Sequence, residues 1–162
     1  MVKNAVEKTN VLRLLDSKKI EYTVYHTTLD QTHTASEVAS DIGMDVSVVY
    51  KTLVTTSKSN KNYVFVLPAN KELDLKKCAK AVGEKSVEML KSKLLLSLTG
   101  YVHGGCSPFM MKKQFTTVFD KDAESLDKIL VNAGKIGTLV EIKVADIEKL
   151  IRVTFQDIAD FS

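Results

Sequence analysis

The chain has 162 residues, of which 44% are hydrophobic and 27% charged, and its formal net charge at pH 7 is +3. This length and composition fit one globular domain over residues 1–162 that buries a core of its own. No stretch approaches the roughly 20 apolar residues that cross a bilayer, and residues 1–10 lack an apolar signal core, so we expect a cytoplasmic protein with no membrane span.

The first quarter of the chain predicts helix, strand, helix. Apolar residues at helical spacing after Thr9, a suitable N-cap, predict a helix that ends near Lys19. Residues 22–25 alternate and are rich in strand formers, which predicts a strand. Residues 34–37 have the Thr-x-x-Glu form of a capping box, which predicts a short helix that ends at Gly43.

A hairpin and a third helix follow. We predict strands at 48–56 and 63–67, joined by the polar turn 57–61. Asp74 is placed to cap a helix over 75–82, where a glycine then stops the helix.

The second half mixes further strands with helices. Residues 87–90 predict a short strand, whereas 92–98 fit a helix or a buried strand, because periodicity cannot decide over so few residues. Beyond them we expect elements with clear apolar patterns: a strand at 115–119, a strand pair at 129–131 and 139–142, and a helix at 145–152. The elements do not alternate strictly, which predicts a mixed sheet rather than a doubly wound parallel one.

Cysteine and histidine are scarce. Cys78 and Cys106 are too few for a secreted disulfide framework, so we expect reduced thiols. The histidines, His26, His33 and His103, form no closely spaced ligand set, and Cys106 three residues after His103 is a weak pair. We therefore expect no metal and no other cofactor.

Lys51 lies inside a predicted strand. Alternation places it on one face with Val49 and Leu53. Either its stem covers apolar surface at a sheet edge while the ammonium reaches water, or it serves a site. The pattern alone leaves both interpretations open.

Three of the seven glycines fall within positions 100–105. They match neither a phosphate loop nor a dinucleotide fingerprint. They indicate either a tight turn or a nest of backbone amides that holds an oxyanion. Cys106 follows in the same loop, but a cysteine nucleophile needs a base within hydrogen-bond reach, which the spacing does not establish. We do not expect it to be catalytic.

Lysines gather in the middle of the chain. They are either solvated surface or a binding face for a polyanion such as RNA. The group comprises Lys76, Lys77, Lys80, Lys85, Lys91, Lys93, Lys112 and Lys113.

A set of short motifs then identifies a family. In chain order they are Tyr50-Lys51-Thr52-Leu53, Asp74-Leu75-Lys76-Lys77, Thr99-Gly100-Tyr101-Val102, Gly104-Gly105, Ser107-Pro108 and Lys112-Lys113. With them, the chain resembles the YbaK/EbsC family of free-standing aminoacyl-tRNA deacylases, relatives of the editing domain inserted in bacterial prolyl-tRNA synthetases. The resemblance covers nearly the whole chain.

The resemblance implies a fold and an activity. The fold would be a single α/β domain around a mixed, strongly curved, barrel-like sheet surrounded by helices. Its pocket would lie between the Lys51 strand, the Gly104 loop and the Asn132 loop. Family members remove a wrongly attached amino acid, chiefly cysteine on proline tRNA. The thiol of the substrate attacks the ester carbonyl of the same cysteine, and the cysteine is released from the tRNA as a thiolactone. This chemistry fits a site poor in histidine and carboxylates.

The resemblance also implies residue roles. Lys51, Gly104 and Gly105 would be catalytic, with Gly104 N–H holding the carbonyl oxygen and Lys51 positioning the terminal adenosine or a phosphate. Substrate contacts would come from Tyr25, Thr34, Thr52, Tyr101, Ser107, Pro108, Asn132 and Gly134. Contacts to the tRNA backbone would come from Lys76, Lys77, Lys80, Lys112 and Lys113.

Two departures bear on specificity. This chain has Asn132 where the best-known members carry Ser, and Thr34 near their Phe. Removal of another small amino acid, such as alanine, therefore stays open, as does a non-catalytic tRNA-binding module. The substrate would be an aminoacyl-tRNA, with tRNA(Pro) favoured, and a prolyl-tRNA synthetase partner stays open.

Overall fold

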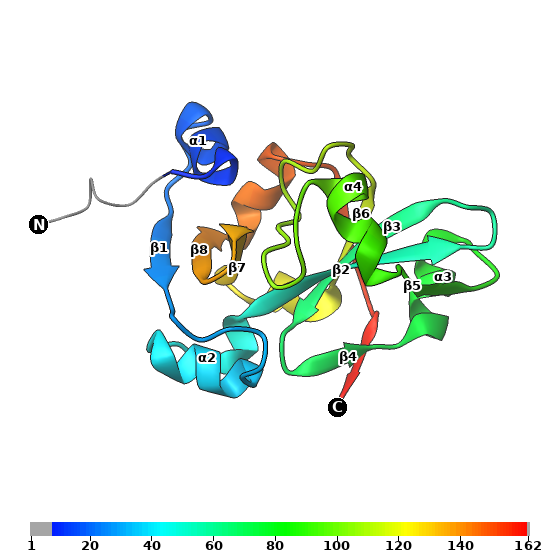
Figure 1. Cartoon of the computed structure of the whole chain (residues 1–162), viewed down its shortest axis with the longest axis horizontal. Helices are drawn as coiled ribbons and strands as arrows, with labels where there is room; N and C mark the ends of the chain where they lie inside the picture. The colour runs from blue at the N-terminus through cyan, green and yellow to red at the C-terminus, as the bar shows by residue number, and fades with distance from the viewer. Residues whose placement is uncertain (1–7, 162) are drawn as a thin grey trace, which may run out of the picture.

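Three small β-sheets organise the chain (Figure 1). The fold is that of a computed structural model, which describes residues 8–161. The largest sheet has the strand order β5-β2-β3-β6-β9. Its members are β2 (Tyr50–Ser57), β3 (Asn62–Pro68), β5 (Val87–Met89), β6 (Thr116–Asp120) and β9 (Val153–Gln156). β2 runs antiparallel to β3 and β5, whereas β6 runs parallel to β3 and β9, so the prediction of a mixed sheet is confirmed.

The second sheet is antiparallel throughout, in the order β1-β8-β7. It consists of β1 (Thr23–His26), β7 (Lys128–Lys135) and β8 (Thr138–Lys143). Figure 1 shows β1 between helices α1 and α2, on the side of the molecule away from α3.

The prediction of a strongly curved, barrel-like sheet is not met. Within residues 8–161, none of the three sheets closes on itself. The β7–β8 hairpin takes β1 as its third strand and meets the five-stranded sheet through an isolated bridge between Val49 and Leu130. Because the backbone groups of the hairpin pair within its own sheet, the strands divide into separate sheets instead of continuing around one barrel.

Predicted helix caps are confirmed. Thr9 and Asp74 accept backbone N–H groups at the starts of two helices, and Thr34 forms a full capping box with Glu37. The α-helices are α1 (Asn10–Ser17), α2 (Ala35–Asp41), α3 (Leu75–Val82) and α4 (Leu95–Thr99). Short 3-10 helices lie at Val46–Val48, Ser92–Leu94, Lys121–Ser125 and Val144–Lys149. The ambiguous residues 92–98 are therefore helical.

The helix predicted at 145–152 is a 3-10 helix, Val144–Lys149. It joins β8 directly to β9 and fully buries a single side chain, that of Ile147. So short a connection gains little packing from a longer, regular α-helix.

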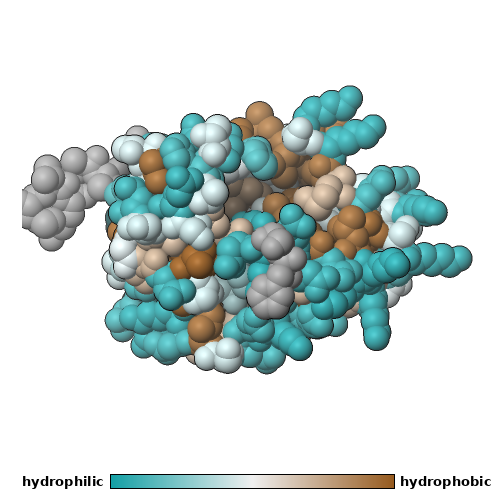
Figure 2. Space-filling model, turned by 90° about the horizontal axis from the view of Figure 1, so that it is seen from below, coloured by the Kyte–Doolittle hydropathy of each residue, from teal (hydrophilic) through white to brown (hydrophobic). Residues whose placement is uncertain are grey.

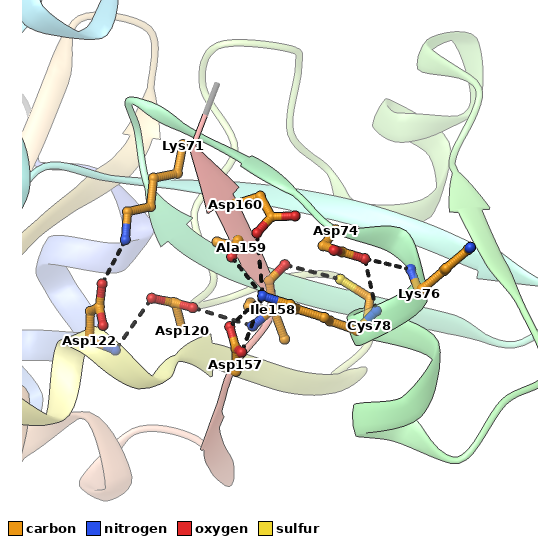
Figure 3. A network of polar contacts seen from close by, with 11 residues as sticks. Lys71, Asp74, Lys76, Cys78, Asp120, Asp122, Asp157, Ile158, Ala159 and Asp160 are labelled. Atoms are coloured by element: carbon orange, nitrogen blue, oxygen red, sulfur yellow. Dashed lines mark hydrogen bonds and ion pairs between the residues drawn. The ribbon is translucent and has the colours of Figure 1, made fainter.

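The C-terminal strand is anchored by polar contacts (Figure 3). β10 (Ala159–Phe161) pairs antiparallel with β4 (Lys71–Leu73), and the sequence analysis predicted neither strand. The buried carboxylate of Asp120 accepts hydrogen bonds from the backbone N–H groups of Ile158 (3.3 Å) and Asp122 (3.3 Å). These bonds join the end of β6 to the chain that leads into β10.

Among the residues that the structure describes, no helix combines the length and hydropathy needed to cross a bilayer.

Candidate active site

A cavity of about 410 Å³ opens along β2. β5 pairs with β2 from Thr55 onward, so the edge of β2 from Lys51 to Val54 is left to face the cavity. The other walls come from the loop over 27–33, residues 89–95, the loop over 103–106 and the turn between β7 and β8. This volume lies in the range of small-molecule sites, about 300–1,000 Å³. The pocket predicted between the Lys51 strand, the Gly104 loop and the Asn132 loop is present.

Three polar side chains of β2 line this cavity without hydrogen-bond partners among the described residues: those of Tyr50, Lys51 and Thr52. Lys51 is half-buried, and burial lowers the pKa of its ammonium, while the charge of Glu72 partly opposes that shift. Within residues 8–161 no hydrogen bond or ion pair engages the Lys51 ammonium. The hydroxyls of Thr52 and Tyr50 are buried and likewise unpaired. Buried polar atoms are normally hydrogen-bonded, so these groups suit polar atoms of a ligand.

Gly104 occupies the third position of a tight turn. Gly105 N–H donates to Val102 O (2.9 Å), which closes the turn, and the φ of Gly104 is +84°. That dihedral favours glycine at this position of a turn. The N–H of Gly104 belongs to the central peptide of the turn and has no partner among the described residues. It is therefore free to donate to an atom in the cavity.

Gly105 differs from its neighbour. Gly105 is buried, and its N–H donates the hydrogen bond that closes the turn. A Cβ at Gly105 would lie 3.1 Å from the backbone nitrogen of Ile136. The N–H of Gly105 is therefore not available for an oxyanion. Gly105 instead permits the close packing of two loops.

Asn132 joins the Gly104 loop to the β7–β8 turn. Its side-chain NH₂ donates to Gly104 O (3.1 Å) and Lys135 O (3.1 Å). Its side-chain oxygen accepts from the N–H groups of Gly134 (2.6 Å) and Lys135 (3.0 Å). Although Asn132 lines the cavity, these four bonds fill its hydrogen-bonding capacity, so it positions the loop.

Four other residues predicted to contact the substrate instead pack within or against the loop that contains Gly104. Tyr101 OH donates to Phe109 O, and a Cβ on Gly134 would lie 3.1 Å from the Tyr101 ring. Ser107 is fully buried, and its Oγ accepts from Phe109 N–H (3.2 Å); Pro108 beside it is also buried. None of these four predicted residues lines the main cavity.

Two further predicted contacts lie outside the cavity. Tyr25 is on β1 and packs in the small cluster that contains Leu139. Thr34 is an exposed N-cap whose oxygen accepts from Glu37 N–H (3.1 Å). The capping bond occupies the Thr34 side chain.

The structure adds polar residues that the sequence analysis missed. Asp30, Gln31, His33 and His103 all line the cavity. The expectation of a site poor in histidine and carboxylates is therefore wrong. An Asp and a His three residues apart, just before a capping box, were the available signal, but nothing local indicated that this loop faces Gly104.

Cys106 also lines the cavity, from the loop after Gly104. Its side chain is buried, and burial raises the pKa of the thiol to about 12. A thiol in this environment stays protonated near neutral pH and is a weak nucleophile.

The predicted RNA-binding lysines have different surroundings. The Lys77 ammonium pairs with Asp157 (3.2 Å) and Asp160 (3.3 Å) at the C-terminal end of the chain. The aliphatic stem of Lys112 covers Gly100, and its Nζ donates to Ser97 O (3.4 Å). Lys76, Lys80 and Lys113 are exposed.

The surface seen in Figure 2 carries both hydrophilic and apolar side chains. Long hydrophilic side chains project from this face, and apolar patches lie between them. Two exposed apolar side chains, Met89 and Ile136, also line the main cavity.

Residues 30–150 match the model of the aminoacyl-tRNA editing domain. The chain belongs to this family. A curated relative from Enterococcus faecalis, EbsC, is 41% identical over 157 residues, which cover 96% of each chain. That protein is named as a proposed Cys-tRNA(Pro)/Cys-tRNA(Cys) deacylase. The family predicted from the sequence motifs is confirmed.

Solved structures share the fold of this editing domain. A crystal structure of a hypothetical protein superimposes with a TM-score of 0.83 at 20% identity, covering 94% of this chain and 100% of the other. A protein proposed to be a trans-editing enzyme for prolyl-tRNA synthetase superimposes with a TM-score of 0.79 at 20% identity, covering 95% and 99%.

Proposed function

We propose that this editing domain is an aminoacyl-tRNA deacylase that removes cysteine from mischarged proline tRNA. The single observation that carries the proposal is the free N–H of Gly104 at a cavity that also holds unpaired Lys51 and Thr52. The name of the EbsC relative supports the choice of substrate.

In this mechanism the protein supplies orientation and charge stabilisation. The cysteine thiol of the substrate attacks its own ester carbonyl, a sulfur–carbon bond forms, and the bond to the 3′-oxygen of the tRNA breaks. Negative charge develops on the carbonyl oxygen, where the fixed N–H of Gly104 donates to it. Lys51 places the terminal adenosine or a phosphate as a point charge, and Thr52 contacts the substrate beside it.

Exposed lysines would hold the tRNA backbone. Lys112 and Lys113 lie on the segment that follows the Gly104 loop, so they are the lysines that we propose nearest the ester. Lys76 and Lys80 project from α3 and would extend this surface. Lys77 contributes least, because two carboxylates already neutralise it.

A panel of mischarged tRNAs tests the function. We expect the purified protein to release cysteine from Cys-tRNA(Pro) faster than it releases alanine from Ala-tRNA(Pro), with a thiolactone as the first product. A faster release of alanine would assign the alternative substrate and would contradict attack by the substrate's own thiol, because alanine carries none. Release from none of the tRNAs, together with retained tRNA binding, would show a binding module.

Cys106→Ser is expected to keep most of the deacylase activity. The buried thiol of Cys106 has a pKa raised to about 12, and the proposed nucleophile belongs to the substrate. Single-turnover release of cysteine measures the effect. An acyl-enzyme trapped on Cys106 of the unsubstituted protein would contradict the mechanism.

A further inference from the structure

The cavity wall opposite β2 carries a paired acid and imidazole. His33 Nδ1 lies 3.2 Å from Asp30 Oδ1. The same carboxylate oxygen accepts the backbone N–H (2.9 Å) and the hydroxyl (2.5 Å) of Thr32. These Thr32 bonds, and then His33, hold the pKa of Asp30 below its usual value. Asp30 is therefore an ionised acceptor for the ring of His33, and both side chains are exposed.

The loop that carries this pair contacts the β7–β8 turn, helix α2 and the Gly104 turn. Thr27 N–H donates to Gly137 O (2.9 Å), and a Cβ on Gly137 would lie 2.6 Å from Thr27 O, so glycine permits this contact. Thr27 Oγ1 also donates to Asp41 Oδ2 (2.6 Å). A Cβ on Gly104 would lie 3.0 Å from Gln31 Oε1, so the loop over 27–33 also packs against the turn that contains Gly104.

We propose that His33 is the catalytic acid–base group of this site and that Asp30 is its positioning residue; this rests on the proposed function. Asp30 accepts Nδ1–H, which leaves Nε2 with the lone pair that takes a proton. Nε2 removes the thiol proton of the esterified cysteine as its sulfur bonds to the carbonyl carbon. The same proton passes to the 3′-oxygen as the carbon–oxygen bond breaks, so His33 ends the cycle neutral.

The other titratable groups at the cavity suit this role less well. Burial raises the pKa of the Cys106 thiol to about 12 and also raises that of the Tyr50 hydroxyl, so both groups stay protonated. Lys51 faces the cavity from β2, and the proposed function already uses its ammonium to place the terminal adenosine or a phosphate. His103 has no carboxylate partner among the residues described. Glu37 on α2 is close enough for His33 to help lower the Glu37 pKa, after the larger effect of the Thr34 N–H.

The test compares His33→Gln and Asp30→Asn with a matched control, His26→Gln. His26 is an exposed histidine on β1 that does not line the cavity. We expect His33→Gln to lower single-turnover release of cysteine from Cys-tRNA(Pro) about 10²-fold near pH 7. Asp30→Asn should cause a smaller loss, and His26→Gln none. Melting curves and tRNA binding should be unchanged in all three.

The pH profile separates a proton-transfer role from a structural one. The wild-type pH profile should reach a plateau on its alkaline side, because the neutral imidazole is the base that takes the thiol proton. The His33→Gln rate should instead rise about tenfold per pH unit until the substrate thiol is ionised, and added imidazole should restore part of the activity.

Two results would overturn the proposal. One is a wild-type rate and pH profile in folded His33→Gln, and the other is a loss confined to KM. A wild-type protein that releases no cysteine would overturn both the proposed deacylase function and the role of His33. Release of cysteine by the wild-type protein at a rate that His33→Gln does not change would overturn the role of His33 alone.

Discussion

Gly104→Ala is expected to lower deacylation by about 10²–10³-fold, the effect of removing one oxyanion donor in other enzymes. The added Cβ would lie 3.0 Å from Gln31 Oε1, and the φ of +84° is unfavourable for alanine. Relaxation of the turn would rotate the Gly104 N–H away from the carbonyl oxygen. Single-turnover release of cysteine at saturating protein concentration measures the loss.

Gly43→Ala is the matched control for backbone strain. Gly43 follows α2 with a φ of +75°, and a Cβ there would meet nothing within 4 Å. Each substitution should therefore destabilise the fold by a similar amount, about 1–2 kcal/mol, or a few degrees in Tm. Only Gly104→Ala should lose activity. Equal turnover in the two folded variants would reduce Gly104 to an ordinary turn residue.

Local chemistry explains which elements could be predicted. The Thr34 capping box, the Asp74 cap and the 57–61 hairpin turn each depend on neighbours within a few residues, so a single sequence specifies them. β4 and β10 could not be predicted in the same way. Each has three residues, and they pair across most of the chain, from Leu73 to Ala159.

The arrangement of the sheets has the same explanation. Apolar patterns identified β2, β7 and β8 as strands, but such patterns do not state which edges pair. The hairpin pairs with β1, and its backbone pairing toward the large sheet is limited to the bridge between Val49 and Leu130. A barrel and a set of separate sheets have similar strand patterns, so the family resemblance decided the prediction, and its barrel-like description does not fit.

The candidate site was predicted in part. The structure brings Lys51, Thr52, Gly104 and Asn132 to one cavity, as the family resemblance implies. The motifs did not distinguish the free N–H of Gly104 from the occupied one of Gly105, because that depends on the direction of a single turn.

The His33 loop was missed for a different reason. The position of this loop in the cavity wall depends on two long-range contacts. Thr27 and Gly137 are about a hundred residues apart along the chain, and Gln31 and Gly104 are about seventy apart. No local pattern reports such a contact.

Lys51→Ala is expected to lower deacylation at least tenfold, which corresponds to about 1.4 kcal/mol of transition-state stabilisation. The half-buried ammonium faces the cavity with no partner in the described structure, so its interactions are left for the substrate. The comparison uses single-turnover release of cysteine by Lys51→Ala and by Lys58→Ala, which removes an exposed lysine from the turn after β2.

Stability should move in the opposite direction from activity. Burial lowers the pKa of Lys51 in the folded state, so below its unfolded pKa the charged form costs folding free energy, and that cost disappears only at higher pH. Removing the ammonium therefore leaves Tm at neutral pH equal to or above that of the wild-type protein. A variant that melts normally and deacylates normally would mean that the Lys51 stem merely covers apolar surface. A variant with a raised Tm and lost turnover would mean that the fold tolerates an unfavourable charge because the substrate needs it.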